Sequence, residues 1–181
     1  MNIENILNEG IKILKQSKTP NPQLDSEILL SNSIKRDKKH IILNPKELLS
    51  LEQTDTFKNL IERREKGEPI AYLINQKEFW KDKFFVNKDV LIPRPDTELI
   101  IEQVIKIYSK DSQLQVLDIG TGSGCILLSI LKERPNFYGT GIDISKKSIN
   151  VSKLNAKQLN LTNRVKFFHS SVDNFKIGKY D

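Results

Sequence analysis

The chain has 181 residues, 38% hydrophobic and 29% charged, which is ordinary for a globular protein and leaves room for one domain or two small ones. Its longest apolar run is interrupted by Ser129, and the first twenty residues lack the apolar core of an export signal, so neither a membrane span nor export is expected. A single cysteine excludes an internal disulfide and suits a reducing cytoplasm, and with only two histidines beside it no metal site is expected.

The net charge is +6, and the positive excess is spread along the chain. The densest basic stretch is Lys35-Arg36-Asp37-Lys38-Lys39, which we interpret first as a solvated surface. Contact with RNA or the ribosome is the alternative interpretation of the same stretch. Direct nucleic-acid binding is therefore kept as an alternative and is not favoured.

The first 70 residues predict a small helical domain. Apolar residues recur on one face of a helix over 2–15, and Asn21-Pro22 caps a second helix. Asn44-Pro45 opens a third stretch, and Thr54 with Asp55 is expected to cap the helix that follows. Aromatic residues are scarce here, so the domain would need to dock to gain stability.

Residues 71–95 change character and predict a β-hairpin linker. Two apolar segments, 78–80 and 84–86, flank a charged turn. The run Leu91-Ile92-Pro93-Arg94-Pro95-Asp96 is rigid and extended, because each proline restricts itself and its predecessor. Asp96 is expected to cap the next helix.

From residue 96 onward, short apolar strands alternate with helices, which predicts an α/β domain with a parallel sheet. The expected strands are 115–119, 137–142 and 165–169, and the expected helices between them are 124–134 and 145–160.

The most informative segment is Val116-Leu117-Asp118-Ile119-Gly120-Thr121-Gly122-Ser123-Gly124. A strand ends in an acid, Asp118, and three glycines then turn the chain where a Cβ would block the approach of a ligand. Asp143 ends the next strand. This pattern predicts a βαβ unit that holds a nucleoside-bearing cofactor at its carboxyl edge.

The glycine spacing favours S-adenosylmethionine (SAM) over NAD. A dinucleotide fingerprint would place its third glycine at position 125, which is Cys125. SAM carries a sulfonium and an amino group and no phosphate, so Asp118 suits its cations, and Asp143 can accept both ribose hydroxyls. A nucleotide-free α/β turn is the structural alternative, and a P-loop is excluded because no Gly-Lys-Ser/Thr follows.

Three segments together resemble the HemK/PrmC family, the protein-(glutamine-N5) methyltransferases that modify peptide chain release factors. They are Gly67-Glu68-Pro69-Ile70-Ala71-Tyr72-Leu73, Leu91-Ile92-Pro93-Arg94-Pro95-Asp96-Thr97-Glu98, and the glycine loop with Asp143 downstream. The glycine loop alone indicates only a SAM-dependent methyltransferase, and the proline-rich segment is the more specific of the three.

The resemblance covers essentially the whole chain and implies three parts. Residues 1–70 would be a helical bundle that helps to recognise the release factor, and residues 71–95 a β-hairpin linker. Residues 96–181 would be the N-terminal part of a Rossmann-like, class I SAM-dependent methyltransferase domain with an incomplete sheet.

The resemblance also implies the cofactor contacts. They fall on Asp118, Gly120, Thr121, Gly122, Ser123, Gly124 and Asp143, with the adenine at Ser171 and Val172. Relatives often carry an Asp at the position of Ser171, so adenine binding is expected to lose one hydrogen bond, or about 1 kcal/mol.

One family motif, Asn-Pro-Pro-Tyr at the end of the fourth strand, is absent from the chain. In the family this motif orients the glutamine amide, so no catalytic residue is assigned, and the chain resembles the N-terminal two-thirds of a methyltransferase. The favoured function is SAM-dependent N5-methylation of a release-factor glutamine, with these 181 residues an inactive or partial form. The alternatives are a non-catalytic fragment that binds SAM or a partner and, less favoured because the charge is diffuse, a nucleic-acid adenine-N6 methyltransferase.

Overall fold

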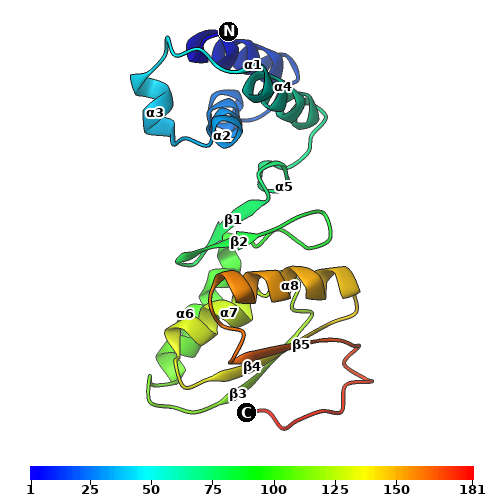
Figure 1. Ribbon diagram of the computed structural model, residues 1–181. Helices are drawn as coiled ribbons and strands as arrows, with labels where there is room; N and C mark the ends of the chain where they lie inside the picture. Colours follow the sequence, from blue (N-terminus) through cyan, green and yellow to red (C-terminus); the bar gives the residue numbers. More distant parts are fainter. The chain divides into compact units, whose positions relative to one another are not determined.

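The computed structural model describes residues 1–181, which form two compact units, Met1–Ile74 and Asn75–Asp181. The first unit is entirely helical (Figure 1). Its helices are α1 (Ile3–Gln16), α2 (Pro22–Ile34), α3 (Lys38–Leu43), α4 (Leu51–Glu65) and the single turn α5 (Ile70–Leu73).

Side-chain caps explain where these helices begin. The Asn2 side chain accepts a hydrogen bond in the first turn of α1, and Asp37 does the same for α3. Pro22 occupies the first position of α2, where its missing N–H costs nothing. Ser50 and Gln53 cap α4 reciprocally, which satisfies two backbone N–H groups at once.

One expectation for this unit is wrong. The cap of α4 is Ser50 rather than Thr54 or Asp55, because the reciprocal cap starts the helix a turn earlier. The stretch opened by Asn44-Pro45 is irregular up to Ser50 and includes an isolated β-bridge between Leu48 and Asn2 at the start of the chain.

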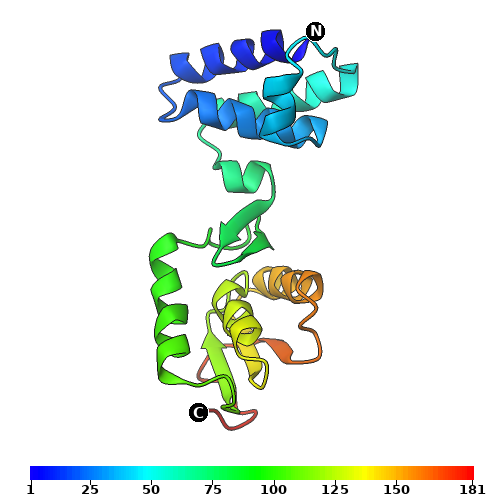
Figure 2. The ribbon, with the colours of Figure 1, turned by 90° about the vertical axis from the view of Figure 1, so that its left-hand side faces the viewer.

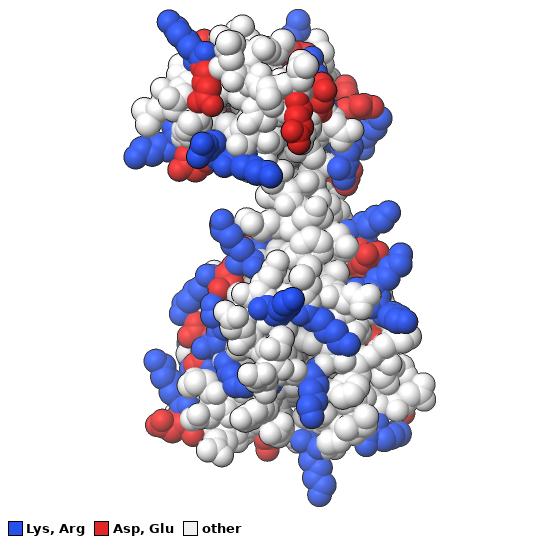
Figure 3. Space-filling view, viewed as in Figure 1, with Lys and Arg blue, Asp and Glu red and all other residues white.

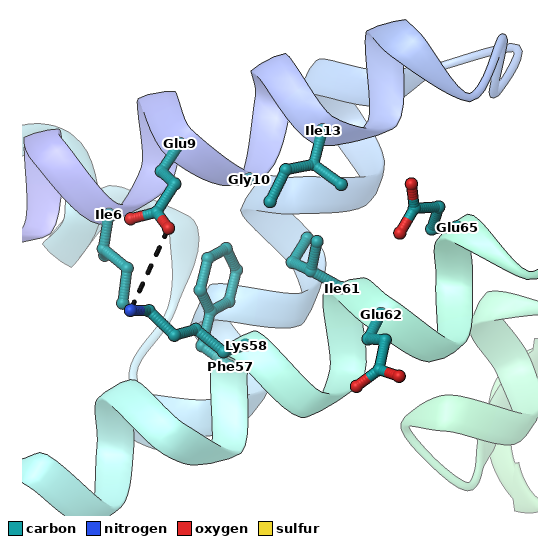
Figure 4. A pocket seen from close by; sticks show the side chains of 9 residues that line it. All are labelled: Ile6, Glu9, Gly10, Ile13, Phe57, Lys58, Ile61, Glu62 and Glu65. Carbon is teal, nitrogen blue, oxygen red and sulfur yellow. Dashed lines mark ion pairs between the residues drawn. The ribbon is translucent and has the colours of Figure 1, made fainter.

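The core of the first unit lies between α1, α2 and α4, where the largest buried side chains are Ile3, Ile6, Leu14, Leu29, Leu30, Phe57 and Ile61. Helices α1 and α4 approach closely at Gly10, since a Cβ there would lie 2.7 Å from Cζ of Phe57. The two helices line a groove of about 210 Å³ that includes this contact (Figure 4). Ile13 and Ile61 face each other across the groove, and Glu9, Lys58, Glu62 and Glu65 surround it.

The second unit is a hairpin followed by alternating helices and strands. Its elements are β1 (Gln76–Phe79), β2 (Asp82–Phe85), the 3₁₀ turn η1 (Pro95–Thr97), α6 (Glu98–Ile107), β3 (Gln115–Ile119), α7 (Cys125–Glu133), β4 (Tyr138–Asp143), α8 (Lys146–Gln158) and β5 (Val165–His169). The predicted hairpin, the three predicted strands and the helices between those strands are all present, with boundaries that differ by no more than two residues for the strands and helices of the sheet.

The sheet is parallel with the order β3-β4-β5, and β1 pairs with β2 in the antiparallel sense. Helices α7 and α8 lie on one side of the parallel sheet, and α6 packs beside α7 (Figures 1 and 2). The core of this unit lies between these helices and the sheet, and it includes Phe79, Phe84, Leu127, Leu128, Phe137 and Phe167. This α/β architecture agrees with the predicted fold class.

The hairpin belongs to the second unit by its contacts. The indole Nε1 of Trp80 donates to Oε1 of Glu133 at 2.8 Å, and the Trp80 backbone N donates to Oε1 of Glu98 at 2.7 Å. Lys81 also donates to Glu133, at 2.5 Å. Trp80 has φ +56°, a left-handed conformation that costs energy for a bulky residue, and these carboxylates hold it there.

Asp96 does not cap the helix that follows it. It lies inside η1, so the α-helical bonding of α6 begins only at Glu98. The residue before α6 is Thr97, whose side chain makes no capping hydrogen bond. The two prolines of the preceding segment explain the difference, because Pro95 starts the tight turn and Asp96 is already part of it.

Charged side chains are mixed on the surface of both units. Figure 3 shows Lys and Arg dispersed over each unit rather than gathered in one patch. None of the helices is long and apolar enough to cross a membrane.

Candidate cofactor site

The three parallel strands end at a common edge, and the glycine loop, residues 120–124, follows β3 and opens the β3-α7-β4 crossover at that edge. Gly120 and Thr121 both donate their backbone N–H to the carbonyl oxygen of Ile142, at 2.9 and 3.0 Å. The loop after β3 is thereby fixed to the end of β4. This is the edge of an α/β sheet at which ligands characteristically bind.

The three loop glycines serve two different purposes. All have positive φ, +76° at Gly120, +55° at Gly122 and +79° at Gly124, a region that L side chains rarely adopt. A Cβ at Gly120 would meet nothing within 4 Å, and one at Gly122 would meet only the Gly120 carbonyl oxygen at 3.9 Å. A Cβ at Gly124 would instead lie 3.1 Å from Leu128. The first two glycines therefore leave open space for a ligand, and the third allows close packing on α7.

Two carboxylates lie beside this open space. Oδ2 of Asp118 accepts from the Thr121 hydroxyl at 2.7 Å. Asp143 accepts from the backbone N–H of Gly122 through Oδ2 at 2.9 Å, and from that of Ser145 through Oδ1 at 2.8 Å. These donors are neutral, and a carboxylate has about four acceptor positions, so both acids keep capacity for a ligand.

The electrostatics of the pair favour a cationic ligand. Burial raises the pKa of Asp118, the hydrogen bond from Thr121 lowers it, and the like charge of Asp143 raises it, with a net upward shift. Holding both groups ionised is therefore costly, and a positive charge placed between them would reduce that cost.

The end of β5 adds the last predicted residues. The backbone N of Ser170 donates to the Asp143 carbonyl oxygen at 3.0 Å, which brings Ser171 to the same edge as Asp143. Val172 is half exposed, and the carbonyl oxygens of both residues accept from the N–H of Phe175. The nine predicted site residues thus lie at or directly after the ends of three adjacent strands.

Sequence reasoning missed two residues at this edge. Ile144, directly after Asp143, is 77% exposed, and its carbonyl oxygen lies 3.0 Å from Nε2 of His169. The signal in the sequence that could have found Ile144 was its position directly after Asp143. The second residue is Asn155, whose amide contacts the glycine loop from within α8.

Cys125 begins α7 directly after the loop and is buried. Burial raises the pKa of its thiol to about 11, a contact with Ser123 lowers it, and the charge of Asp118 raises it. The thiol is therefore protonated at neutral pH, as expected for a packing residue rather than a nucleophile.

Comparison with known proteins finds two domains along the chain. Residues 5–74 match the PrmC N-terminal domain, and residues 110–181 match a methyltransferase domain. Together with the parallel sheet and the glycine loop, this places the chain in the class of methyltransferases with a helical N-terminal domain.

Curated relatives specify the family. The chain is 44% identical over 180 residues to a release factor glutamine methyltransferase of Buchnera aphidicola subsp. Baizongia pistaciae, an alignment that covers 96% of the chain and 64% of that relative. It is 39% identical to the protein of the same name from Coxiella burnetii, over 90% of the chain and 60% of the relative. The resemblance to release factor glutamine methyltransferases that the sequence motifs indicated is thus confirmed along nearly the whole chain.

The chain spans about 60% of the length of these relatives. It also matches a bifunctional methyltransferase of Rickettsia bellii at 36% identity, over 99% of the chain and 37% of that relative. Among solved structures, a SAM-dependent methyltransferase from Geobacter sulfurreducens in complex with S-adenosyl-L-homocysteine is 30% identical, over 42% of this chain and 29% of its own, with a TM-score of 0.36.

Proposed function

We propose that the glycine loop binds SAM, and that the protein to which these residues belong transfers its methyl group to the amide nitrogen of a glutamine in a release factor. The observation that carries the proposal is the open loop at Gly120 and Gly122 between two carboxylates that lack cationic partners. Similarity to release factor glutamine methyltransferases along 90–96% of the chain supports the substrate.

The residues of the site fit the chemistry of SAM. SAM supplies an electrophilic methyl group on a positively charged sulfur. Asp118 would face the cationic end of the ligand, and Asp143 would accept hydrogen bonds from the ribose hydroxyls. Gly120 and Gly122 would allow the backbone to approach the ligand without a Cβ between them. Thr121 would keep Asp118 oriented through the hydrogen bond that it already donates.

The remaining assignments of the site are proposed on position. Ser123 and Gly124 complete the loop, and Ser171 and Val172 would contact the adenine from the end of β5. Ile144 would add an apolar contact on the same side, because it is exposed and next to Asp143.

The proposed domain roles separate substrate recognition from cofactor binding. Residues 1–70 would contact the release factor, residues 71–95 would link the two parts, and residues 96–181 would bind SAM. The match of residues 5–74 to the PrmC N-terminal domain supports the first role. The groove between α1 and α4 is the surface that we assign to it. Glu9 pairs with Lys58 and Glu62 with Lys66, so Glu65 is the acid of the groove without an ion pair, and we expect a segment with an apolar anchor and a basic residue that meets Glu65. A protein that methylates release factors would act in the cytoplasm.

Titration calorimetry with SAM tests the cofactor assignment. Gly122→Val puts a branched side chain into the open loop, and we expect a loss of SAM affinity of at least tenfold. Gly67→Val is the matched control, because Gly67 also has positive φ, +91°, and open space around it, but lies in the first unit. Equal SAM affinity in the wild type and Gly122→Val would overturn the assignment.

A second experiment tests the partner. Glu65→Lys reverses a charge on the rim of the groove, and Glu52→Lys, at the exposed start of α4, is the control outside it. In a full-length relative carrying these changes, we expect Glu65→Lys to raise KM for the release factor and to leave SAM affinity unchanged. A rise of the same size in both variants would show that only net charge matters.

A further inference from the structure

Asn155 lies in the last turn of α8, is 1% exposed, and uses its side-chain amide to join two distant segments of the second unit. Its Nδ2 donates to the carbonyl oxygen of Ser123 at 2.8 Å and to that of Phe85 at 3.0 Å. Its Oδ1 accepts from the backbone N–H of Phe85 at 2.7 Å. Both N–H groups and the oxygen of the amide are thus bonded to backbone.

On the hairpin side, Asn155 takes the place of a neighbouring strand. Phe85 is the last residue of β2, which pairs with β1 along one edge only. Its outward N–H and C=O are partly buried and would otherwise be left without partners, and such groups are costly unless bonded. The amide of Asn155 satisfies both, as an adjacent peptide group would.

On the loop side, Asn155 fixes the peptide between Ser123 and Gly124. The N–H groups of the loop have other acceptors: Gly120 and Thr121 donate to the Ile142 carbonyl oxygen, Gly122 donates to Asp143, and Gly124 donates to the Thr121 carbonyl oxygen at 2.8 Å. These hold the amide groups of the loop. The bond from Asn155 is the one that holds the Ser123 carbonyl, and Ser123 is itself only 2% exposed.

Packing alone does not require an amide at this position. Asparagine is a weaker helix former than alanine or leucine, and a buried amide is favourable only when its hydrogen bonds are all made. An apolar residue would fill the same space next to Ala156 at lower cost. The cost of burying the amide is offset where its hydrogen bonds fix the geometry of neighbouring segments, here the glycine loop and β2.

We propose that Asn155 is a positioning residue for the cofactor loop, and that through it the hairpin strand β2 is part of the support of that loop. This inference rests on the proposed binding of SAM at Gly120–Gly124. Loss of the two N–H donors would free the Ser123 carbonyl, and the flanking glycines would then sample conformations that do not fit the ligand.

The test compares Asn155→Ala, Asn155→Asp and Ala156→Gly in the full chain. Asn155→Asp keeps the volume and the acceptor for Phe85, but replaces both donors with an oxygen. Ala156→Gly is the matched control, since it weakens α8 at the neighbouring buried position without contact to the loop. All variants are measured at a temperature at which circular dichroism shows them folded, so that either Asn155 variant suffices if the other does not fold.

Two readouts separate positioning from general destabilisation. Amide hydrogen exchange without ligand should speed up at least tenfold at Gly122–Cys125 in the Asn155 variants, and not in Ala156→Gly. The SAM dissociation constant should rise about tenfold in the same variants and stay within twofold in the control.

Unchanged loop exchange in both Asn155 variants would overturn the positioning role, whatever the SAM affinity. If the wild type does not bind SAM, the proposed function fails, while the exchange experiment still decides whether Asn155 orders the loop.

Discussion

The backbone N–H of Gly122 donates to Oδ2 of Asp143 at 2.9 Å, so a side chain of β4 joins the loop after β3 to the end of β4. A loop that is held by such bonds loses less conformational freedom on binding, which reduces the entropy cost. The same bond uses one oxygen of the acid that we assign to the ribose. Asp143 therefore combines two tasks, shaping the glycine turn and presenting its remaining acceptor positions to the cofactor.

Replacing Asp118 with Asn should make the unliganded protein more stable and its SAM binding weaker. The pKa of Asp118 is raised in the fold, so the folded state binds this proton more tightly than the unfolded chain does. Ionisation of Asp118 thus costs stability as pH rises through the interval between its unfolded and folded pKa values, and the cost persists at higher pH. Asp118→Asn removes that cost and also the negative charge that would face the cations of SAM.

Urea unfolding at several pH values and calorimetry with SAM measure the two effects. We expect a higher unfolding free energy at pH 7 and a loss of SAM affinity of about tenfold, the order expected for one charged contact. Asp111→Asn, at an exposed acid in the loop before β3, is the control and should change neither. A stabilised variant with full SAM affinity would remove Asp118 from the site.

Gly10→Ala should destabilise the first unit without affecting SAM binding. The new methyl group would lie 2.7 Å from Cζ of Phe57 and 3.1 Å from Cδ1 of Ile61, both buried side chains that cannot easily move. Overpacking of this kind costs about 1–3 kcal/mol, which exceeds the gain of about 1 kcal/mol in helix propensity. Asn8→Ala, on the exposed side of α1, is the control and should not destabilise. A drop in SAM affinity in Gly10→Ala would contradict the independence of the two units.

Cys125 should resist alkylation in the folded protein. With a pKa of about 11, only about one thiol in a thousand is ionised at pH 8, and the thiolate is the reactive form. Mass spectrometry after treatment with iodoacetamide should show a rate at least a hundredfold lower in the native protein than in urea. The native rate should continue to rise up to about pH 11, where a thiol of ordinary pKa has already reached its plateau. Rapid labelling at pH 8 without denaturant would show that the loop opens.

The parallel sheet was predictable because three short strand-like segments alternate with two helical ones, and Asp118 and Asp143 mark the ends of the first two strands. Local signals also located Asp118, the glycines and Asp143, since cofactor loops of this kind depend on residues close in sequence. Asn155 could not be found in this way, because its partners Ser123 and Phe85 are 32 and 70 residues away. The predicted cap of α4 was wrong for a different reason. Thr54 and Asp55 are good capping residues, and only the pairing of Ser50 with Gln53 shows that the helix begins before them.

The last prediction concerns a polypeptide of residues 1–181 alone, which we expect to bind SAM without transferring its methyl group. Ligand sites in open α/β sheets lie where strands flank the first strand on both sides. Within these residues β3 has a strand partner on one side, β4, and Ile119 at its end is 56% exposed. On the other side only Asp181 meets β3, where its N–H donates to Gln115 O at 3.1 Å and its Oδ2 accepts from Gln115 N at 2.8 Å. The half of the site that would hold a glutamine amide is therefore not formed by these residues.

Incubation of residues 1–181 with radiolabelled SAM and a release factor should give no labelled glutamine, with a full-length relative as the positive control. Fusion to the C-terminal part of that relative should restore labelling. Methyl transfer by residues 1–181 above background would refute the prediction and show that a residue among them orients the amide.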